Sequence, residues 1–220
     1  MGAIVATCLT LAIVRGDEPK KDAVELKLEL PKPIFQGTPK NVPAGTTVEK
    51  PTGRPRAPLM VPKGTQLLSR DKPVKISDDN PVAGKADMVT DGSKEGADGN
   101  WLEMGPGLQW VQIDLGKPAE IAAIVLWHYH AEPRVYRDVV VQVADDADFI
   151  ENVRTVFNND QDNSAGLGLG KDNEYFELAE GKLIDAKGVT GRYVRCYTKG
   201  STADEQNHCI EVEVHGAWKK

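Results

Sequence analysis

Residues 67–220 consist of short, strand-like runs separated by turns, and this pattern restricts the possible folds more than any other feature. The runs are rich in Val, Ile and aromatic residues, which favour strands, and Gly, Asp and Asn lie between them. No segment of ten or more residues keeps a helical period. Short strands at this spacing predict an all-β fold, an antiparallel β-sandwich or jelly roll. The runs read LQWVQIDL, EIAAIVLWHYH, RDVVVQVA, RTVFN, YFELAE, GRYVRCYT and NHCIEVEVHG.

The run EIAAIVLWHYH at residues 120–130 is apolar on both of its faces. In a strand, alternate residues point to opposite sides, so Ile124 and Leu126 share one face while Val125 and Trp127 share the other. A strand of this kind needs a cover on each side. We expect the opposing sheet to cover one face and the N-terminal segment of the chain to cover the other.

The N-terminal segment is rich in proline, since nine of the fourteen prolines lie between Pro19 and Pro62. Proline disfavours long helices and central strands, so an extended path is predicted. Composition alone would favour a disordered tether. However, burial of a large apolar side chain such as Leu28 or Ile34 gains about 1.5–3 kcal/mol. We therefore predict that residues 17–66 form a Pro-rich extension partly packed on a single domain, residues 67–220.

The chain begins with an apolar run from Ala3 to Val14, after which charged residues follow at once. Such a run is long enough for the core of a signal peptide and too short to span a membrane. A buried N-terminal strand or helix would have the same pattern. We interpret residues 1–16 as a signal peptide, which predicts a protein that is secreted or located in the periplasm or cell envelope.

An oxidising compartment would allow Cys196 and Cys209 to form a disulfide. The alternation of apolar residues places Cys209 on the strand face opposite to that of Ile210, Val212 and Val214. A disulfide would then require a bulge or a shifted register. The sequence leaves both the paired and the free state open.

The net charge of −6 and the isoelectric point near 5.3 argue against nucleic-acid and anionic-membrane partners, because both require clustered Lys and Arg. The sequence contains no G-x-S-x-G elbow and no recognisable Cys–His arrangement for nucleophilic catalysis. We therefore predict that the protein is not an enzyme.

Five segments resemble, in the correct order, the motifs of a known family, the discoidin or coagulation factor five/eight type C domains. The resemblance implies a galactose-binding-like jelly roll that is mostly non-enzymatic. Members bind glycans, proteins or phospholipid head groups through loops at one end of the sandwich, and many hold a structural calcium ion. The segments are TDGSKEGADGNW, WVQIDLGKPAEIAAIVLW, VVVQVADDADF, GRYVRCYT and CIEVEVHG.

The same resemblance implies a calcium site between the loop at residues 90–100 and the first glutamate of the final strand. Asp91 and Glu211 match the family's ligands directly, and Asp98 or Asn100 would supply the remaining side chain. The loop has the oxygen-bearing residues and glycines that calcium sites use. The alternative is an acidic turn without an ion.

A second acidic loop, NNDQDNSAGLGLG, occupies residues 158–170. It is not an EF-hand, because Ala165 stands where that motif needs Gly and Lys171 stands where it needs Glu. It also matches neither phosphate-binding glycine motif. Long loops of this composition are often functional or ordered by their own hydrogen bonds, so we treat it as a candidate ligand or partner surface.

Two histidines, His128 and His130, are two residues apart and would point to the same side of a strand. They could hold a transition metal if a third ligand joined them, and His208 or Asp138 would serve only if folding brought it close. The alternative is that His128 completes the packing of the core while His130 begins the following loop.

A sugar site would need an aromatic platform beside a few polar groups. The candidate ligand-binding residues are His130, Arg134, Asn207 and His208, with Trp101 as the platform, although this Trp in the related domains usually packs against the domain. We therefore predict a non-catalytic module that binds a glycan or glycoprotein. The alternative is a structural or docking protein of a cell-envelope or secreted enzyme assembly, with a protein partner and no sugar binding.

Overall fold

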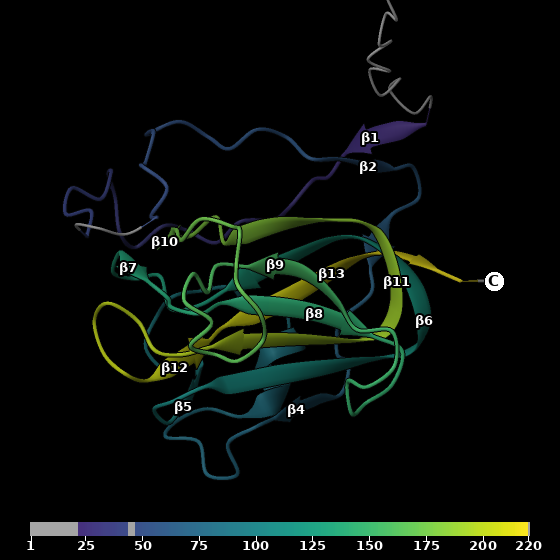
Figure 1. The fold of residues 1–220 in the computed structure, drawn as a ribbon. Coiled ribbons are helices and arrows are strands. Elements are labelled where there is room, and N and C mark those ends of the chain that lie inside the picture. Colours follow the sequence, from purple (N-terminus) through teal and green to yellow (C-terminus); the bar gives the residue numbers. More distant parts are fainter. Residues whose placement is uncertain (1–21, 44–46, 220) are drawn as a thin grey trace, which may run out of the picture.

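The computed structural model describes residues 22–43 and 47–219, which form an almost entirely β structure (Figure 1). Within these residues the helical structure is η1, a five-residue 3-10 helix at Ala86–Thr90. No helix in the described part of the chain is long and apolar enough to cross a membrane. All named strand pairs are antiparallel, so the predicted all-β antiparallel fold is confirmed.

The main sheet orders its strands β3-β13-β6-β11-β8-β9, and β4 pairs with β6 outside this path. Two of the strands are far longer than the others, β6 with 19 residues and β11 with 17 residues, and they pair with each other over most of their length. The strands of this sheet are β3 (Gln66–Leu67), β4 (Val74–Ile76), β6 (Gln109–Trp127), β8 (Val140–Ala144), β9 (Arg154–Asn158), β11 (Lys182–Thr198) and β13 (Glu211–Trp218).

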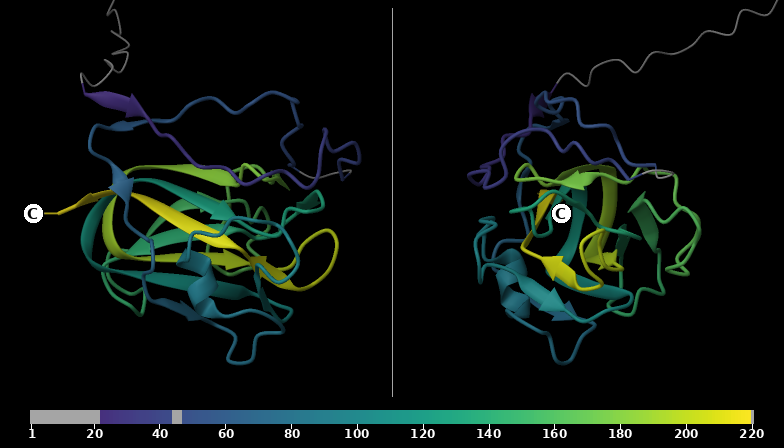
Figure 2. Two further views of the ribbon diagram at one scale, coloured as in Figure 1. Left: turned by 180° about the vertical axis from the view of Figure 1, so that it is seen from behind. Right: turned by 90° about the vertical axis from the view of Figure 1, so that its left-hand side faces the viewer.

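The long strand β11 is irregular, and its irregularities bend the sheet around the core. Its pairing with β6 shifts register between Asp185 and Val189 and again between Gly191 and Tyr193. Bulges of this kind bend and twist a strand. A Cβ atom on Gly191 would lie 2.3 Å from Cγ1 of Val143, so only glycine permits the close approach of β11 and β8 at this bend. Figure 2 shows the strands around the interior from two further directions.

The two faces of β6 pack into two different apolar clusters, as the alternation in the sequence predicts. Ile124 and Leu126 belong to the main core between the strands. Val125 and Trp127 belong to a second cluster, which they form with Ile210. All five side chains are fully buried, so the end of β6 is covered on both sides.

The Pro-rich extension lies along the domain (Figure 1). It begins and ends in a small sheet in which β1 (Ala23–Glu25) pairs with β2 (Met60–Pro62). Between these strands, Leu28 packs against the second apolar cluster, and the amide of Glu49 donates to the carbonyl of Glu174 at 2.8 Å. The signal peptide lies outside the described residues, and it stays a prediction, as does the exact division between extension and domain.

Cys196 and Cys209 are both buried free thiols in the main core. The predicted parity of Cys209 is confirmed relative to Ile210 and wrong relative to Val212 and Val214, because the chain leaves one strand at Cys209 and enters the next at Glu211. Cys209 therefore shares the core with Val212, whereas Ile210 points to the second cluster. Burial raises the pKa of the Cys196 thiol to about 12, so this thiol is unreactive at neutral pH.

We predict that Leu28→Ala lowers the free energy of unfolding by about 1–2 kcal/mol, since the side chain is partly buried against the second cluster. Leu30→Ala is the matched control, because Leu30 is 50% exposed, and it should change stability by less than about 0.5 kcal/mol. Urea denaturation of the two variants measures both values. Equal effects would mean that Leu28 does not anchor the extension.

Candidate functional site

Several short strands meet at the end of the domain where β6 ends (Figure 1). Two pairs of them bring distant parts of the chain together: β12 pairs with β5, and β10 pairs with β7. In the first pair His208 lies opposite Glu103. The strands are β5 (Leu102–Met104), β7 (Arg134–Val135), β10 (Phe176–Glu177) and β12 (Asn207–Cys209).

Two partly exposed aromatic residues form the apolar part of this end. The rings of Trp101 and Tyr129 meet edge to face, with centroids 4.8 Å apart. Trp101 also packs against the second apolar cluster, and its Nε1 donates to Oε2 of Glu103 at 3.3 Å. The ring therefore has the packing role that is usual in the related domains and still presents part of its surface to solvent.

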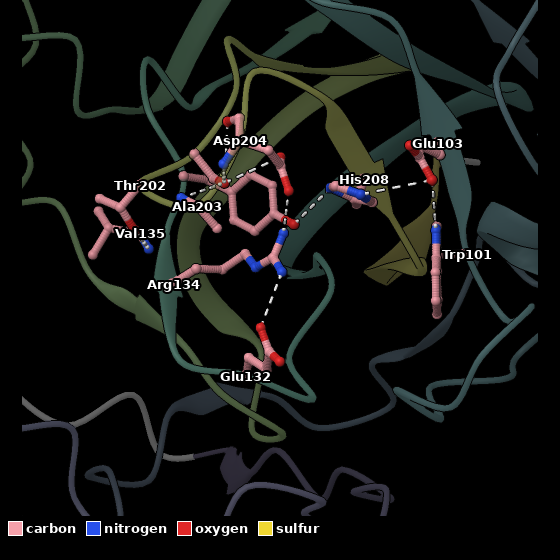
Figure 3. Close-up of polar contacts among 11 residues, drawn as sticks. Trp101, Glu103, Glu132, Arg134, Val135, Thr202, Ala203, Asp204 and His208 are labelled. Atoms are coloured by element: carbon pink, nitrogen blue, oxygen red, sulfur yellow. Dashed lines mark hydrogen bonds and ion pairs between the residues drawn. The ribbon is translucent and has the colours of Figure 1, made fainter.

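The guanidinium of Arg134 lies over the ring of Tyr129, 4.6 Å from its centroid. Arg134 donates to Oδ2 of Asp204 at 3.0 Å and pairs with Oε2 of Glu132 at 3.5 Å (Figure 3). Only 8% of Arg134 is exposed. The charged group is therefore held in one orientation by an aromatic face and two carboxylates.

His208 lies between the aromatic pair and the polar groups. Its Nδ1 is 3.1 Å from the hydroxyl of Tyr136, and its Nε2 is 3.8 Å from Oε2 of Glu103 (Figure 3). Burial lowers the pKa of His208, although the nearby carboxylates of Asp204 and Glu103 act in the opposite direction. His208 is therefore neutral at neutral pH. These residues form one surface, which we call the aromatic end surface: Trp101, Glu103, Tyr129, Arg134, Asp204 and His208.

A buried carboxylate, Glu211, begins β13 beneath the loop at residues 90–100. Its Oε2 accepts a hydrogen bond from the amide of Gly92 at 3.1 Å, while its Oε1 is buried without a hydrogen-bond partner. Burial raises the pKa of Glu211 to about 8, and the carboxylates of Glu213 and Asp91 add to this effect. A buried carboxylate oxygen without a partner is costly, so a cation would fit here.

Comparison with known proteins identifies the domain. Residues 88–196 match the model of the F5/8 type C group described as the NedA-like, galactose-binding domain. Residues 88–196 therefore belong to an F5/8 type C domain. The resemblance expected from the five sequence motifs is thus confirmed. No curated protein matches the chain.

Solved structures share the fold of this F5/8 type C domain at low sequence identity. They include a family 89 glycoside hydrolase from Clostridium perfringens in complex with PUGNAc, with a TM-score of 0.52 and 17% identity over 70% of this chain. A fucolectin from the serum of striped bass (Morone saxatilis) has a TM-score of 0.51 and 15% identity over 70% of this chain. Truncated AlyQ with CBM32 and alginate lyase domains has a TM-score of 0.51 and 15% identity over 71% of this chain.

These relatives are larger than the chain that they match. The chain spans 15% of the glycoside hydrolase, 48% of the fucolectin and 34% of the truncated AlyQ. At such identities the likeness shows the galactose-binding-like fold alone.

Three of the five predicted ligand residues of the F5/8 type C domain come together in the aromatic end surface, namely Trp101, Arg134 and His208. The other two, His130 and Asn207, are buried and bind backbone groups. Nε2 of His130 is 2.9 Å from the carbonyl of Lys94. Asn207 donates to two carbonyls at 2.7 and 3.1 Å and accepts from one amide at 2.7 Å, so its side chain is fully used in shaping the loops.

Sequence reasoning missed three members of the surface, Glu103, Tyr129 and Asp204. Glu103 follows Trp101 by two residues, a spacing that places two strand residues on the same side, so this signal was available. Tyr129 lies between His128 and His130, where the opposite parity predicts the opposite face. Asp204 lies in an irregular loop and carries no such signal.

The two histidines of LWHYH bind different partners. The ring of His128 stacks on Tyr136 with centroids 4.2 Å apart, and its Nδ1 is 2.8 Å from Oε2 of Glu177. His130 faces the carbonyl of Lys94. Among the described residues, neither histidine belongs to a group of three side chains placed to hold a metal ion.

The predicted calcium ligands other than Glu211 lie at different points of their loop. Asp91 is exposed, and its Oδ1 accepts from the amide of Ser93 at 2.7 Å. Asp98 is also exposed; burial raises the pKa of Tyr129, and the charge of Asp98 adds to this effect. Asn100 is half-buried. The involvement of Asp98 or Asn100 in calcium binding stays a prediction.

The second acidic loop brings three carboxylates together, with ligand oxygens of Asp138, Asp160 and Asp162 all within 4.8 Å of one another. The oxygens of the fully buried Asp160 accept hydrogen bonds from the amides at 164 and 165. Nζ of Lys199 lies 3.8 Å from Oδ2 of Asp138. The loop is thus ordered by its own hydrogen bonds and contacts a cation from outside it, Lys199, beside a cavity of about 410 Å³.

We predict that, in calcium-free buffer, the free energy of unfolding falls by roughly a few kcal/mol when the pH is raised from about 4.5 to about 8. The pKa of Glu211 is about 8 in the fold against an ordinary value of 4.5, so the folded protein holds a proton that the unfolded chain has lost. The stabilisation is complete below the unfolded pKa and disappears as the pH rises through the folded pKa.

Urea denaturation at several pH values measures this dependence. Glu211→Gln should flatten it, whereas Glu205→Gln, which changes an exposed glutamate near the same end, should leave it unchanged. A pH profile that is the same in wild type and Glu211→Gln would contradict the assignment.

Proposed function

We propose that the protein is a non-catalytic binding module that recognises a glycan or glycoprotein through the aromatic end surface. The observation that carries the proposal is the arrangement of Trp101 and Tyr129 beside an Arg and a His whose orientations are fixed. Sugar sites combine an aromatic platform with a few precisely placed polar groups. The family of the domain and the fold that it shares with a fucolectin support this reading.

The surface offers both kinds of hydrogen-bonding group that sugar hydroxyls require. Arg134 supplies only donors, while the carboxylates of Glu103 and Asp204 supply acceptors. A hydroxyl group can accept from the first and donate to the second. The apolar side of a sugar ring would lie against the exposed part of Trp101. Stacking there would displace water that is bound only weakly to the aromatic ring.

The proposal contains no catalytic step. A glycoside hydrolase needs one carboxyl group as a proton donor and a second as nucleophile or base. In the aromatic end surface Glu103 accepts from Nε1 of Trp101, and Asp204 accepts from Arg134. Both carboxylates are therefore placed as hydrogen-bond acceptors that orient a ligand.

The context that we propose is an exported chain that acts alone or beside a larger assembly. The matched domain covers only part of a glycoside hydrolase and part of a protein with CBM32 and alginate lyase domains, which supports an accessory role. A secreted, periplasmic or cell-envelope location rests on the apolar N-terminal run. Docking on a protein partner without sugar binding is the alternative function.

We also propose a structural calcium ion held by Glu211 and Asp91, with Asp98 or Asn100 as a further ligand. Its support is the buried Oε1 of Glu211, which has no partner, and the oxygen-rich loop above it. This loop leads directly into Trp101. An ion that stiffens the loop would therefore fix the platform of the aromatic end surface.

The glycan proposal predicts that the wild-type protein binds glycans on an array and that Trp101→Ala weakens binding at least about tenfold, because the platform is lost. Arg134→Ala should have a similar effect. Trp218→Ala is the matched control, because Trp218 lies at the opposite end of β13 from Glu211 and should leave binding unchanged. Silence across the array together with tight co-purification of one protein would favour the docking function.

The calcium proposal predicts that calcium raises the melting temperature at pH 8, where the carboxyl of Glu211 would otherwise be buried as an unpaired charge. Glu211→Gln should abolish the increase. Asp138→Asn, in the second acidic loop, is the control and should retain it. An unchanged wild-type midpoint would remove the proposed ion, and a loss of the effect in Asp138→Asn instead would place the ion in the second loop.

A further inference from the structure

The buried hydroxyl of Tyr136 contacts His208 of the aromatic end surface, and the direction of their hydrogen bond can be deduced. Tyr136 is 1% exposed, and its oxygen lies 3.1 Å from Nδ1 of His208. Among the described residues this nitrogen is the one hydrogen-bond partner of the hydroxyl. The hydrogen between the two atoms belongs either to the hydroxyl or to Nδ1.

If Nδ1 carried the hydrogen, the buried hydroxyl proton would have no acceptor, and the lone pair of Nε2 would face the carboxylate of Glu103 at 3.8 Å. The proton of the Tyr136 hydroxyl therefore points toward His208. Burial raises the pKa of Tyr136 well above its ordinary value, so the group remains an O–H donor at any physiological pH. Nδ1 of His208 must then be the nitrogen that accepts. In a neutral imidazole one nitrogen carries the hydrogen and the other does not, so the hydrogen of His208 is on Nε2.

Nε2–H of His208 faces Glu103 across a gap. The distance from Nε2 to Oε2 of Glu103 is 3.8 Å, which is too long for a direct hydrogen bond. The same Oε2 atom accepts from Nε1 of Trp101. One hydroxyl oxygen beside these two atoms could accept from Nε2–H and donate to Oε2, and it would lie next to the platform ring.

We propose that Tyr136 is a positioning residue that fixes the proton of His208 on Nε2, so that His208 and Glu103 together bind a single hydroxyl group of the glycan. The proposal rests on the proposed glycan function for the identity of the ligand. The assignment of the proton itself depends only on the protein.

The surroundings of Tyr136 hold its hydroxyl in place. Its ring stacks on the ring of His128 with an interplanar angle of 17°, and Nδ1 of His128 is 2.8 Å from Oε2 of the buried Glu177. A shift of the Tyr136 ring would break its stacking on His128, which Glu177 holds in place. His128, the first histidine of LWHYH, thus lies beneath the surface and stabilises the position of Tyr136, which in turn contacts His208.

A protonated His208 would conflict with this arrangement. It would present an N–H at Nδ1 to the hydroxyl and leave the buried hydroxyl proton without an acceptor, and the charge of Arg134 would repel it further. Glu103 and Asp204 face His208 from the other side and favour the charged form, while Arg134, His128 and burial oppose it. The pKa of His208 is lowered on balance, in agreement with a neutral ring.

Long-range ¹⁵N–¹H correlation spectra of the full chain test the proton assignment without any ligand. The expected wild-type spectrum shows His208 as the neutral Nε2–H tautomer at pH 7. Tyr136→Phe removes the donor to Nδ1, so His208 should become a mixture of tautomers. Tyr175→Phe is the matched control, because Tyr175 is also buried but its hydroxyl has no partner, and it should leave His208 unchanged.

An Nδ1–H or doubly protonated His208 in the wild type would overturn the proposal, as would an unchanged tautomer in Tyr136→Phe. Circular dichroism of Tyr136→Phe shows whether that variant is folded. If it is not, the wild-type spectrum still decides the assignment.

Titration with galactose, fucose and N-acetylglucosamine tests the hydroxyl site. For a sugar that binds, Tyr136→Phe should weaken affinity by about twofold to tenfold, the effect of one misdirected hydrogen bond. His208→Gln, whose amide can donate from near the position of Nε2, should bind more tightly than His208→Asn. Equal affinities of these two variants would overturn the hydroxyl site. Failure of every sugar and of the glycan array would overturn both this site and the proposed function, while the tautomer result would stand.

Discussion

The structure depends on the burial of both faces at the end of β6. Ile124 and Leu126 complete the main core, and Val125 and Trp127 on the other face require a separate apolar cover. That cover comes from Ile210, from Leu28 of the extension and from Trp101 of the loop that follows η1. Because the cover includes Trp101, the packing that stabilises the strand also places the platform of the proposed glycan site.

The alternation of β6 continues beyond its last paired residue and divides the motif LWHYH between interior and surface. His128 and His130 turn inward, where each finds its own acceptor, a carboxylate of Glu177 and a carbonyl of Lys94. Tyr129 turns outward and meets Trp101 and Arg134. The two histidines of the same parity thus make two separate contacts in the interior, and the residue between them, Tyr129, lies in the aromatic end surface.

The fold follows from local patterns, whereas the site depends on contacts between distant strands. Runs of β-branched and aromatic residues with turn residues between them were enough to predict an antiparallel β fold, and five motifs were enough for the family. The types and approximate positions of Trp101, Arg134 and His208 were also predictable.

The pairing of β12 with β5, which places Glu103 opposite His208, was not predictable, because the register between strands about one hundred residues apart has no local signal. Burial of His130 and Asn207 was missed for the same reason, and a change of strand at Ile210 placed Cys209 in the same core cluster as Val212.

Two buried carboxylates on β13 differ in the charged groups around them, and this difference distinguishes a structural ion pair from a candidate ion site. Glu211 and Glu213 are both buried and point to the same side of the strand. Burial would raise the pKa of Glu213, but His215 at 3.0 Å and Lys94 at 2.7 Å outweigh it and lower the pKa. Glu211 has only the amide of Gly92 as a hydrogen-bond partner, and the charge of Arg70 does not offset burial, so its pKa is raised to about 8. Among the described residues, cations thus contact one carboxylate directly and not its neighbour. Since an unpaired buried charge is costly, Glu211 must either keep its proton or obtain a positive charge from outside the chain, and the oxygen-rich loop above it would hold a calcium ion in the second case.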